Sequence, residues 1–242
     1  MKGMKIFQLI NIKLSNLIPN KLKTKYRYLK QRLRFKAIAN RNKVINIPVE
    51  GLNGNGLKFI EDKKLLKKSF PGEIIEDFPS SIQDYNDLKE KSLKRYGLRQ
   101  HFKDGLSWEE TDLFKIRYKE ELKKERKKGC DNLNDLAKLY QREIDTLYKD
   151  IKINGFKNPN IDMNVDPIYI HIGSEGELIW TSNGNHRYYI AEILNIEFIP
   201  VKVWWRHINW QLVRENAYKL GKDDFIKKYP QYKLHPDLKD LI

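Results

Sequence analysis

The sequence predicts an α+β fold: a small mixed β-sheet with helices, preceded by a helical region and a basic N-terminal arm. Three observations lead to this prediction. Apolar residues alternate along 168–172 and 200–205, as in half-buried strands, and they recur at helical spacing through much of 107–151. Positive charge is concentrated near the N-terminus. The predicted segments are a basic amphipathic arm (1–43), an irregular or mixed region (44–106), a helical region (107–139), an α/β domain (140–212) and a C-terminal helical tail (213–242).

The basic arm carries most of the net charge. The formal charge of the chain is +15, and residues 1–43 contain 13 Lys and Arg with no acid before Glu50, so only +2 remains for the other 199 residues. Pro19 divides the arm into two segments, each with apolar residues at helical spacing. Such a basic amphipathic segment fits an anionic membrane surface, a nucleic-acid backbone or a partner protein. Docking on the chain's own body is the alternative interpretation.

Cysteine usage and hydropathy limit the class of protein. A single cysteine, Cys130, forms no internal disulfide, which favours a reducing cytoplasm, with peripheral membrane contact left open. Cys130 is expected to be a packed residue, because nothing in the sequence marks it as activated. Paired cysteines with zinc-ligand spacing are absent, so no metal site is predicted. No run of about 18 apolar residues occurs, so we expect no transmembrane helix.

The first half of the chain offers fewer signals than the second. Residues 44–49 are predicted to form one short strand, and the Gly- and Asn-rich stretch 51–56 a loop. Ser107 followed by Glu109 and Glu110 is typical of a helix start, and Gly129 of a helix end. Another helix is expected to begin near Asn132, with a helical pattern continuing towards residue 155.

From Pro167 the apolar period changes from helix to strand. Residues 168–172 and 178–180 are predicted to form a hairpin around the turn 173–177. The run 182–185 breaks the second strand, a short helix follows, and residues 200–205 form a third strand. This order places the sequence Gly184-Asn-His-Arg187 at a junction between a strand and a helix.

The chemistry of this junction suits a phosphate group. The first backbone N–H groups of a helix have no partners within the helix, and the helix dipole favours an anion there. Gly184 allows close approach, and Arg187 supplies a planar fork of donors. His186 can donate a hydrogen bond or transfer a proton near neutral pH. We therefore predict a phosphate site formed by Asn183, Gly184, Asn185, His186 and Arg187, with His186 as a catalytic candidate.

Three runs of sequence carry a resemblance to a known superfamily. They are Asp150-Ile-Lys-Ile-Asn-Gly-Phe-Lys-Asn-Pro159, Glu177-Leu-Ile-Trp-Thr-Ser-Asn-Gly-Asn-His-Arg187 and Ala191-Glu-Ile-Leu-Asn-Ile-Glu-Phe-Ile-Pro-Val-Lys-Val203. Together they resemble the ParB N-terminal/sulfiredoxin superfamily over about 70 residues, including the family's phosphate-binding box and its short following helix. The resemblance implies a ParB/sulfiredoxin-like fold for 140–212 and binding of ATP or another nucleotide with Mg²⁺.

Two departures from the family pattern narrow the expectation. Asn185 stands where sulfiredoxins have their reactive cysteine, which argues against sulfiredoxin activity. Only about 30 residues follow the domain, too few for the helix-turn-helix domain that ParB proteins use to bind DNA. The remaining implication is a kinase-type phosphotransferase or a nucleotide hydrolase, acting on a small-molecule or glycan-type acceptor.

Further residues are candidates for the same site. Glu177 and Glu110 are candidate catalytic carboxylates, against the simpler interpretations of a solvated hairpin residue and a helix-start acid. Arg206 and His207 follow the third strand, where a cationic pair could face a phosphate; surface placement is the alternative. Two other functions stay open at this point. One is nucleic-acid binding through the basic arm, and the other is a catalytically silent protein held at a membrane surface.

Overall fold

The structure is a computed structural model, and it describes residues 20–49, 58–60, 69–76, 82–84, 93–160, 166–181 and 184–242. The described helices are α2 (Asn20–Arg34), α6 (Leu93–Phe102), α7 (Asp112–Glu125), α8 (Leu133–Tyr140), α9 (Thr146–Asn154), α10 (Asn185–Ile193), α11 (Ile208–Leu220) and α12 (Lys222–Lys228). The described strands are β1 (Val44–Pro48), β2 (Lys58–Ile60), β3 (Glu73–Ile75), β4 (Ile82–Asp84), β5 (Ile168–Ile172), β6 (Leu178–Thr181) and β7 (Phe198–His207). The helix predicted before Pro19 lies outside the described residues.

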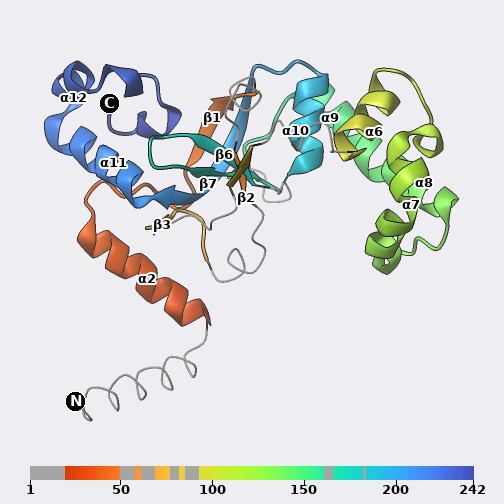
Figure 1. Ribbon diagram of the computed structural model, residues 1–242, viewed down its shortest axis with the longest axis horizontal. Coiled ribbons are helices and arrows are strands. Elements are labelled where there is room, and N and C mark those ends of the chain that lie inside the picture. Colours follow the sequence, from red (N-terminus) through yellow and green to blue (C-terminus); the bar gives the residue numbers. More distant parts are fainter. Residues whose placement is uncertain are drawn as a thin grey trace, which may run out of the picture.

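The seven described strands form one mixed sheet in the order β1-β7-β5-β6-β2-β4, and β3 pairs with the end of β7. β5 and β6 form the predicted antiparallel hairpin, while β7 runs parallel to β5 and antiparallel to β1. Figure 1 shows this sheet at the centre of the molecule, between the helices α6–α10 and the helices α11 and α12. The predicted α+β class with a mixed sheet is therefore confirmed.

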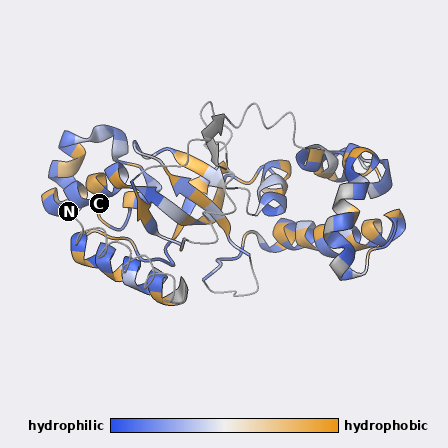
Figure 2. Cartoon of the chain, turned by 60° about the horizontal axis from the view of Figure 1, so that its bottom comes forward, coloured by the Kyte–Doolittle hydropathy of each residue, from blue (hydrophilic) through white to orange (hydrophobic). Residues whose placement is uncertain are grey.

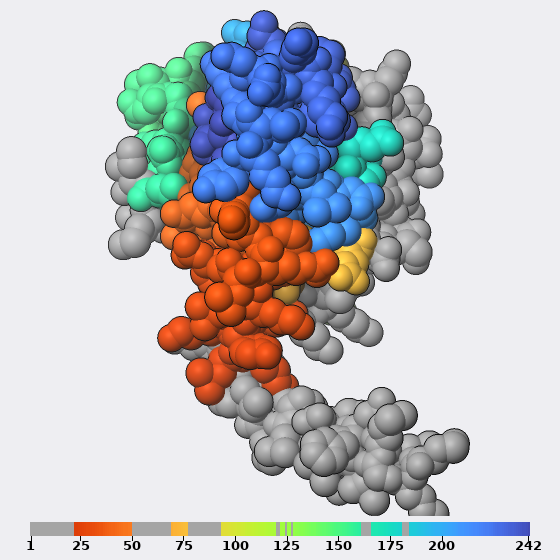
Figure 3. All heavy atoms as spheres, turned by 90° about the vertical axis from the view of Figure 1, so that its left-hand side faces the viewer, coloured from red at the N-terminus to blue at the C-terminus, as the bar shows by residue number. Residues whose placement is uncertain are grey.

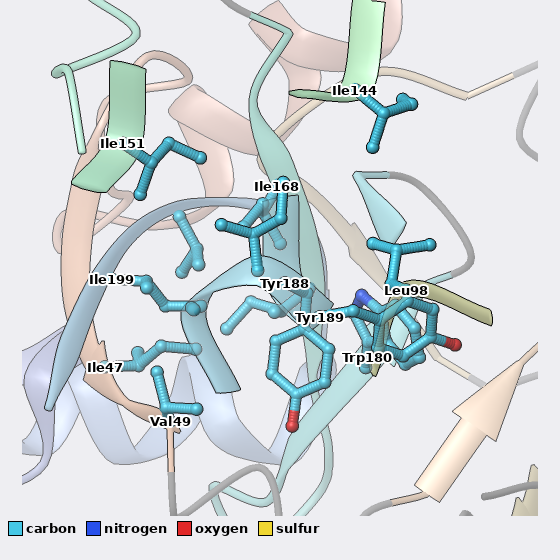
Figure 4. Close-up of a cluster of buried hydrophobic side chains, with 14 of the residues drawn as sticks. Ile47, Val49, Leu98, Ile144, Ile151, Ile168, Trp180, Tyr188, Tyr189 and Ile199 are labelled. Carbon is cyan, nitrogen blue, oxygen red and sulfur yellow. The ribbon is translucent and has the colours of Figure 1, made fainter. Parts of the chain in front are cut away.

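Period-two alternation places one side of β7 in the core. Ile199, Val201 and Val203 are buried in the core, and the side chains between them are only partly buried. Trp205 and Arg206, near the end of the strand, are buried as well. β5 contributes the buried residues Ile168, Ile170 and Ile172 to the same core. Figure 4 shows side chains from β1, α6, α9, β5, α10 and β7 converging on this core. Figure 2 shows apolar residues on the central strands and, alternating with polar ones, along the helices.

A helical layer formed by α6 to α9 packs beside α10. Trp108, at the centre of this layer, is fully buried, and its indole N–H donates to Asp145 Oδ1 at 3.0 Å. α6 lies within the region expected to be irregular or mixed, and its weak apolar pattern gave no signal. The signals at Asn132 and Gly129 are confirmed: Asn132 caps α8, and Gly129 takes φ +80° after the helical segment. Ser107 and Glu110 form a capping box on a short 3₁₀ turn, Trp108–Glu110, and Thr111 is the N-cap of α7 that follows. A π-helical turn, Gln141–Asp145, joins α8 to α9.

The C-terminal tail is tied to the sheet by buried charge. Asp237 accepts hydrogen bonds from Arg206 Nε at 2.9 Å and Arg206 Nη2 at 2.7 Å. α11 crosses residue 212, where the sequence suggested a boundary between the α/β domain and the tail. The tail is therefore packed against the body through a bidentate ion pair, the geometry in which Arg–carboxylate pairs are strongest.

The segment between α2 and β1 also belongs to the body rather than to a free arm. Phe35, Ala37 and Ala39 are buried. The Glu215 carboxylate accepts hydrogen bonds from the backbone N–H groups of Lys36 and Ala37, at 3.1 and 2.7 Å. The arm that protrudes from the body therefore ends near Arg34, although the charge pattern continues to residue 43. In the part of the chain that the structure describes, no helix is long and apolar enough to cross a membrane.

Candidate functional site

The start of α10 is positioned by Gly184, which lies against the first residue of β5. Gly184 has φ +80°, a left-handed conformation that side chains rarely adopt. A Cβ built at this position would lie 2.8 Å from Ile168 Cγ1 and 3.1 Å from Ile168 Cα. Both backbone conformation and space therefore require glycine here. α10 therefore begins directly beside the first residue of β5, at the open end of the hairpin.

The first turn of α10 has the geometry of an anion-binding site. The first bond of the helix runs from Tyr188 N to the Gly184 carbonyl at 3.0 Å. The backbone N–H groups of Asn185, His186 and Arg187 precede that bond, so the helix itself offers them no acceptor. A left-handed residue followed by right-handed ones directs successive N–H groups to one point, as in backbone nests that bind anions.

His186 faces the helical layer. Its imidazole contacts the Tyr140 ring edge-to-face, with centroids 6.1 Å apart, and its side chain is half-buried. Tyr140 is the last residue of α8 and packs in turn on Trp108 and Phe114. The imidazole is therefore held by the junction between α8 and the π-helical turn, a type of helix irregularity that is common at functional sites.

Arg187 faces the end of α9 instead. Its guanidinium lies over the Phe156 ring, 5.2 Å from the centroid, and its Nη1 contacts the Asp166 carbonyl at 3.5 Å. Asp150, one turn before the end of α9, is close enough to interact with this charge. Hydrogen bonds from Asn154 and Lys157 lower the pKa of Asp150, and the positive charge of Arg187 acts in the same direction. Arg187 thus joins α10 to α9 as well as supplying charge at the turn.

Asn185 and Asn183 complete the predicted box. The side-chain oxygen of Asn185 is buried and accepts no hydrogen bond from any described residue. Leaving a buried amide oxygen without a donor costs free energy. Such an unsatisfied group is common in sites that are completed by a ligand or water. Asn183 lies outside the described residues, as does Ser182.

Glu177 lies at the opposite end of the hairpin from this turn. In the β5–β6 register Ile172 faces Leu178, whereas Gly184 lies beside Ile168. At about 3.3 Å per residue, the length of β5 separates the two ends by more than 10 Å. The Glu177 carboxylate folds back over the hairpin turn and accepts the Glu175 N–H at 2.7 Å. Glu177 is therefore close to the turn in sequence but distant from it in space.

Arg206 and His207 are also at the far end of the sheet. Arg206 pairs with Ile172 in the parallel β5–β7 register, and it is 1% exposed. Its guanidinium is engaged by Asp237, and His207 Nδ1 accepts the Asn209 N–H at 3.1 Å as the N-cap of α11. Both side chains have structural partners at this end, so we leave them out of the proposed phosphate site.

Glu110 is used as a helix cap. Its carboxylate accepts hydrogen bonds from Ser107 N at 3.0 Å and Ser107 Oγ at 2.8 Å. These two bonds lower the pKa of Glu110, which is consistent with a carboxylate that stays ionised on the surface. The helix-start interpretation accounts for Glu110, whereas the Asp150 carboxylate interacts electrostatically with Arg187 of the turn. The sequence signal for Asp150 was its place in the run 150–159.

Three positive charges surround the buried Asp237 carboxylate, away from the turn. Burial alone would raise the pKa of the Asp237 carboxyl, but the charges of Arg206, Arg214 and Lys43 outweigh it and hold the pKa far below its ordinary value. Trp210 Nε1 also donates to Asp237, at 3.0 Å. Asp237 is fully buried and surrounded by these partners, so the cluster has the properties of a structural anchor.

Two clefts in the described residues lie near the other end of α10. One is lined by Arg95, Tyr96, Arg99, Lys103, Glu192 and Ile193, and Arg95 Nε contacts Glu192 Oε2 at 2.6 Å. The second is lined by Pro48, Val49, Arg95, Ala191, Glu192, Asn195, Ile196 and Glu197. The turn at Gly184 is thus a backbone-built site beside the hairpin, separate from these surface clefts.

Neither a cluster of metal ligands nor a similar known protein points to a function for this chain. Across the described residues, no three or more His, Cys, Asp or Glu side chains gather as metal ligands. No protein-family model matches the chain, and comparisons with curated proteins and with solved structures also find no match. The function proposed below is therefore inferred from the geometry of the turn.

Proposed function

We propose that the chain is a ParB/sulfiredoxin-like nucleotide-binding protein, with the nucleotide phosphates held at the first turn of α10. One observation carries the proposal. Gly184, forced into the left-handed conformation against Ile168, presents the first N–H groups of α10 with His186 and Arg187 in the same turn. This combination of backbone donors and an arginine is the usual protein solution for binding a phosphate.

The proposed reaction class is phosphotransfer to a small-molecule or glycan-type acceptor, or nucleotide hydrolysis. Both reactions depend mainly on positioning and on neutralising phosphate charge. Mg²⁺ would arrive with the nucleotide, because this ion is usually bound through phosphate oxygens, water and one or two carboxylates. Asp150 is the carboxylate that we propose for this role, since the charge of Arg187 acts on it. His186 is the proposed proton-transfer group.

Calorimetric titration of ATP, ADP and CTP with Mg²⁺ tests the proposal. Wild-type protein is compared with Arg187→Ala and His186→Ala, and with the control Arg142→Ala, which removes an exposed arginine from the π-helical turn. Loss of a charge-assisted hydrogen bond should weaken binding about 10- to 100-fold in Arg187→Ala. Arg142→Ala should bind like wild type, as should Glu177→Gln at the far end of the hairpin.

Two outcomes contradict the proposal. The first is the absence of nucleotide binding by wild-type protein, and the second is binding that neither turn variant weakens. Because Arg187 also packs on Phe156, its alanine variant requires a check of folding by circular dichroism. If that variant unfolds, Arg187→Lys and His186→Ala decide the question, since both retain more of the packing.

Nucleic-acid binding through the basic arm is the alternative function. The observation in its favour is that α2, Asn20–Arg34, contains seven Lys and Arg and no acid. Counterion release would then make affinity fall steeply with salt. Deletion of residues 1–43 is a poor test, because Phe35, Ala37 and Ala39 are part of the body. Substitution of the α2 cations, followed by titration with duplex DNA and RNA, avoids this problem.

A further inference from the structure

α2 exposes an apolar stripe to solvent. The stripe consists of Leu22, Tyr26, Leu29 and Leu33, whose exposed fractions are 55%, 69%, 50% and 90%; we call it the α2 ridge. Its spacing of four, three and four residues places all four side chains on one side of the helix. A ridge of this kind normally packs on a protein core, so its exposure requires an explanation.

The body contacts α2 through the opposite side of the helix. Gln31 exchanges two hydrogen bonds with the Ile74 backbone, at 2.8 and 3.3 Å. Arg27 Nη1 contacts the buried Glu73 carboxylate at 3.1 Å, and Tyr28 packs edge-to-face on Phe70. At roughly 100° per residue, Arg27, Tyr28 and Gln31 lie across the helix from the ridge. Docking on the body therefore does not cover the ridge.

α2 also projects from the body. Figure 1 shows it below β3 and α11, and Figure 3 shows it extending beyond the mass formed by the sheet and the C-terminal helices. Its polar side is already used by the body, while its apolar side points outward. The helix is thus presented in the orientation that an interfacial helix needs, with the protein on one side and an apolar phase on the other.

Positive charge borders the ridge on both sides. Lys25 and Arg32 lie along one edge, and Lys23, Lys30 and Arg34 lie along the other. Lys25, Lys30, Arg32 and Arg34 are exposed, and Lys23 is half-buried. A second copy of the chain is a poor occupant, because its own cations would face these at close range. A nucleic acid satisfies the charges but offers nothing for four apolar side chains.

We propose that α2 binds an anionic lipid surface, with the ridge inserted at the level of the headgroups and the cations contacting lipid phosphates. Each cation near such a surface adds to the electrostatic attraction, and partial burial of the ridge adds hydrophobic free energy. This inference is independent of the α10 turn. It predicts a protein that is recruited to a membrane surface without crossing it.

Flotation of the full-length protein with vesicles tests the inference. Phosphatidylcholine vesicles containing phosphatidylserine are compared with pure phosphatidylcholine vesicles, at low and high salt. The double variant Leu29→Glu/Leu33→Glu should reduce binding to the anionic vesicles by about tenfold or more. The matched control is Ile116→Glu/Leu234→Glu, which places the same charges at exposed apolar positions away from α2.

The inference holds if binding needs anionic lipid, weakens with salt, and is lost in the ridge variant but kept in the control. Equal binding by the ridge variant and wild type overturns it, as does equal binding to both kinds of vesicle. Two results assign the surface to another occupant and also overturn it. One is self-association that the ridge variant abolishes, without any vesicle binding by wild-type protein. The other is duplex DNA binding that the ridge variant leaves unchanged, again without any vesicle binding by wild-type protein.

Discussion

Gly184 and Ile168 are in contact although 16 positions separate them, and this contact places the start of α10 beside β5. A Cβ on Gly184 would be 2.8 Å from Ile168 Cγ1, closer than side-chain carbons normally approach. The predicted phosphate site thus depends on one backbone position that only glycine fills. The same contact brings the end of the β5–β6 hairpin to the N-terminal turn of the helix.

Replacing Gly184 with alanine tests this contact. Gly184→Ala should lower the free energy of unfolding by about 2–4 kcal/mol, because a left-handed alanine and a close contact both cost energy. Gly129→Ala is the control: Gly129 also has φ +80°, but nothing lies within 4 Å of its added Cβ. It should lose only about 1 kcal/mol. Urea denaturation measures both, and equal losses would show that the Ile168 contact is unimportant.

Removing the negative charge of Asp237 is predicted to destabilise the fold strongly. Asp237→Asn removes the carboxylate that compensates Arg206 and Arg214, which are both buried. We expect a loss of about 3–5 kcal/mol, the usual result of leaving buried charges unpaired. Asp240→Asn, at a carboxylate that also binds Arg214 but is 37% exposed, should cost about 1 kcal/mol or less. Similar losses for the two variants would argue against Asp237 as the anchor of the tail.

His171 is predicted to make stability depend on pH. It is buried in β5 and stacked on Trp205, and burial lowers its pKa to about 3. In the unfolded chain its pKa is near 6.5, so below that pH the unfolded state binds a proton that the folded state excludes. Stability should therefore be unaffected above pH 6.5 and fall as the pH drops, by about 2 kcal/mol at pH 5.

Denaturation at pH 7.5 and pH 5 measures this effect. His171→Leu should lose stability from its missing ring contacts at both pH values, while the difference between them becomes smaller. Burial also lowers the pKa of His235, which accepts the Asp237 N–H and contacts the Gly176 carbonyl. The variant is therefore expected to retain part of the pH dependence. An unchanged difference in His171→Leu would exclude His171 as its source.

Most local structure follows from the sequence alone. The strands expected at 168–172 and 200–205, the caps at Ser107 and Asn132, and the turn at Gly129 are confirmed, because each depends on neighbours within a few residues. The half-buried alternation expected along 168–172 is wrong, because His171 is as buried as Ile170 and Ile172. The position of Gly184 at a junction between a strand and a helix is also confirmed, and it too follows from neighbouring residues. Cys130, expected to be packed, is buried.

Relationships between distant segments required the tertiary structure. Sequence proximity suggested that Glu177 and Arg206 could join the turn at Gly184, but the strand registers place both at the other end of β5. The Arg206 guanidinium is paired with the carboxylate of Asp237, which lies 31 positions further along the chain. Apolar spacing in α2 identified the ridge, yet whether it faced the body or solvent depended on the contacts of Arg27 and Gln31. Periodicity defines the faces of an element, whereas the register and long-range pairing that decide what each face meets are absent from any local pattern.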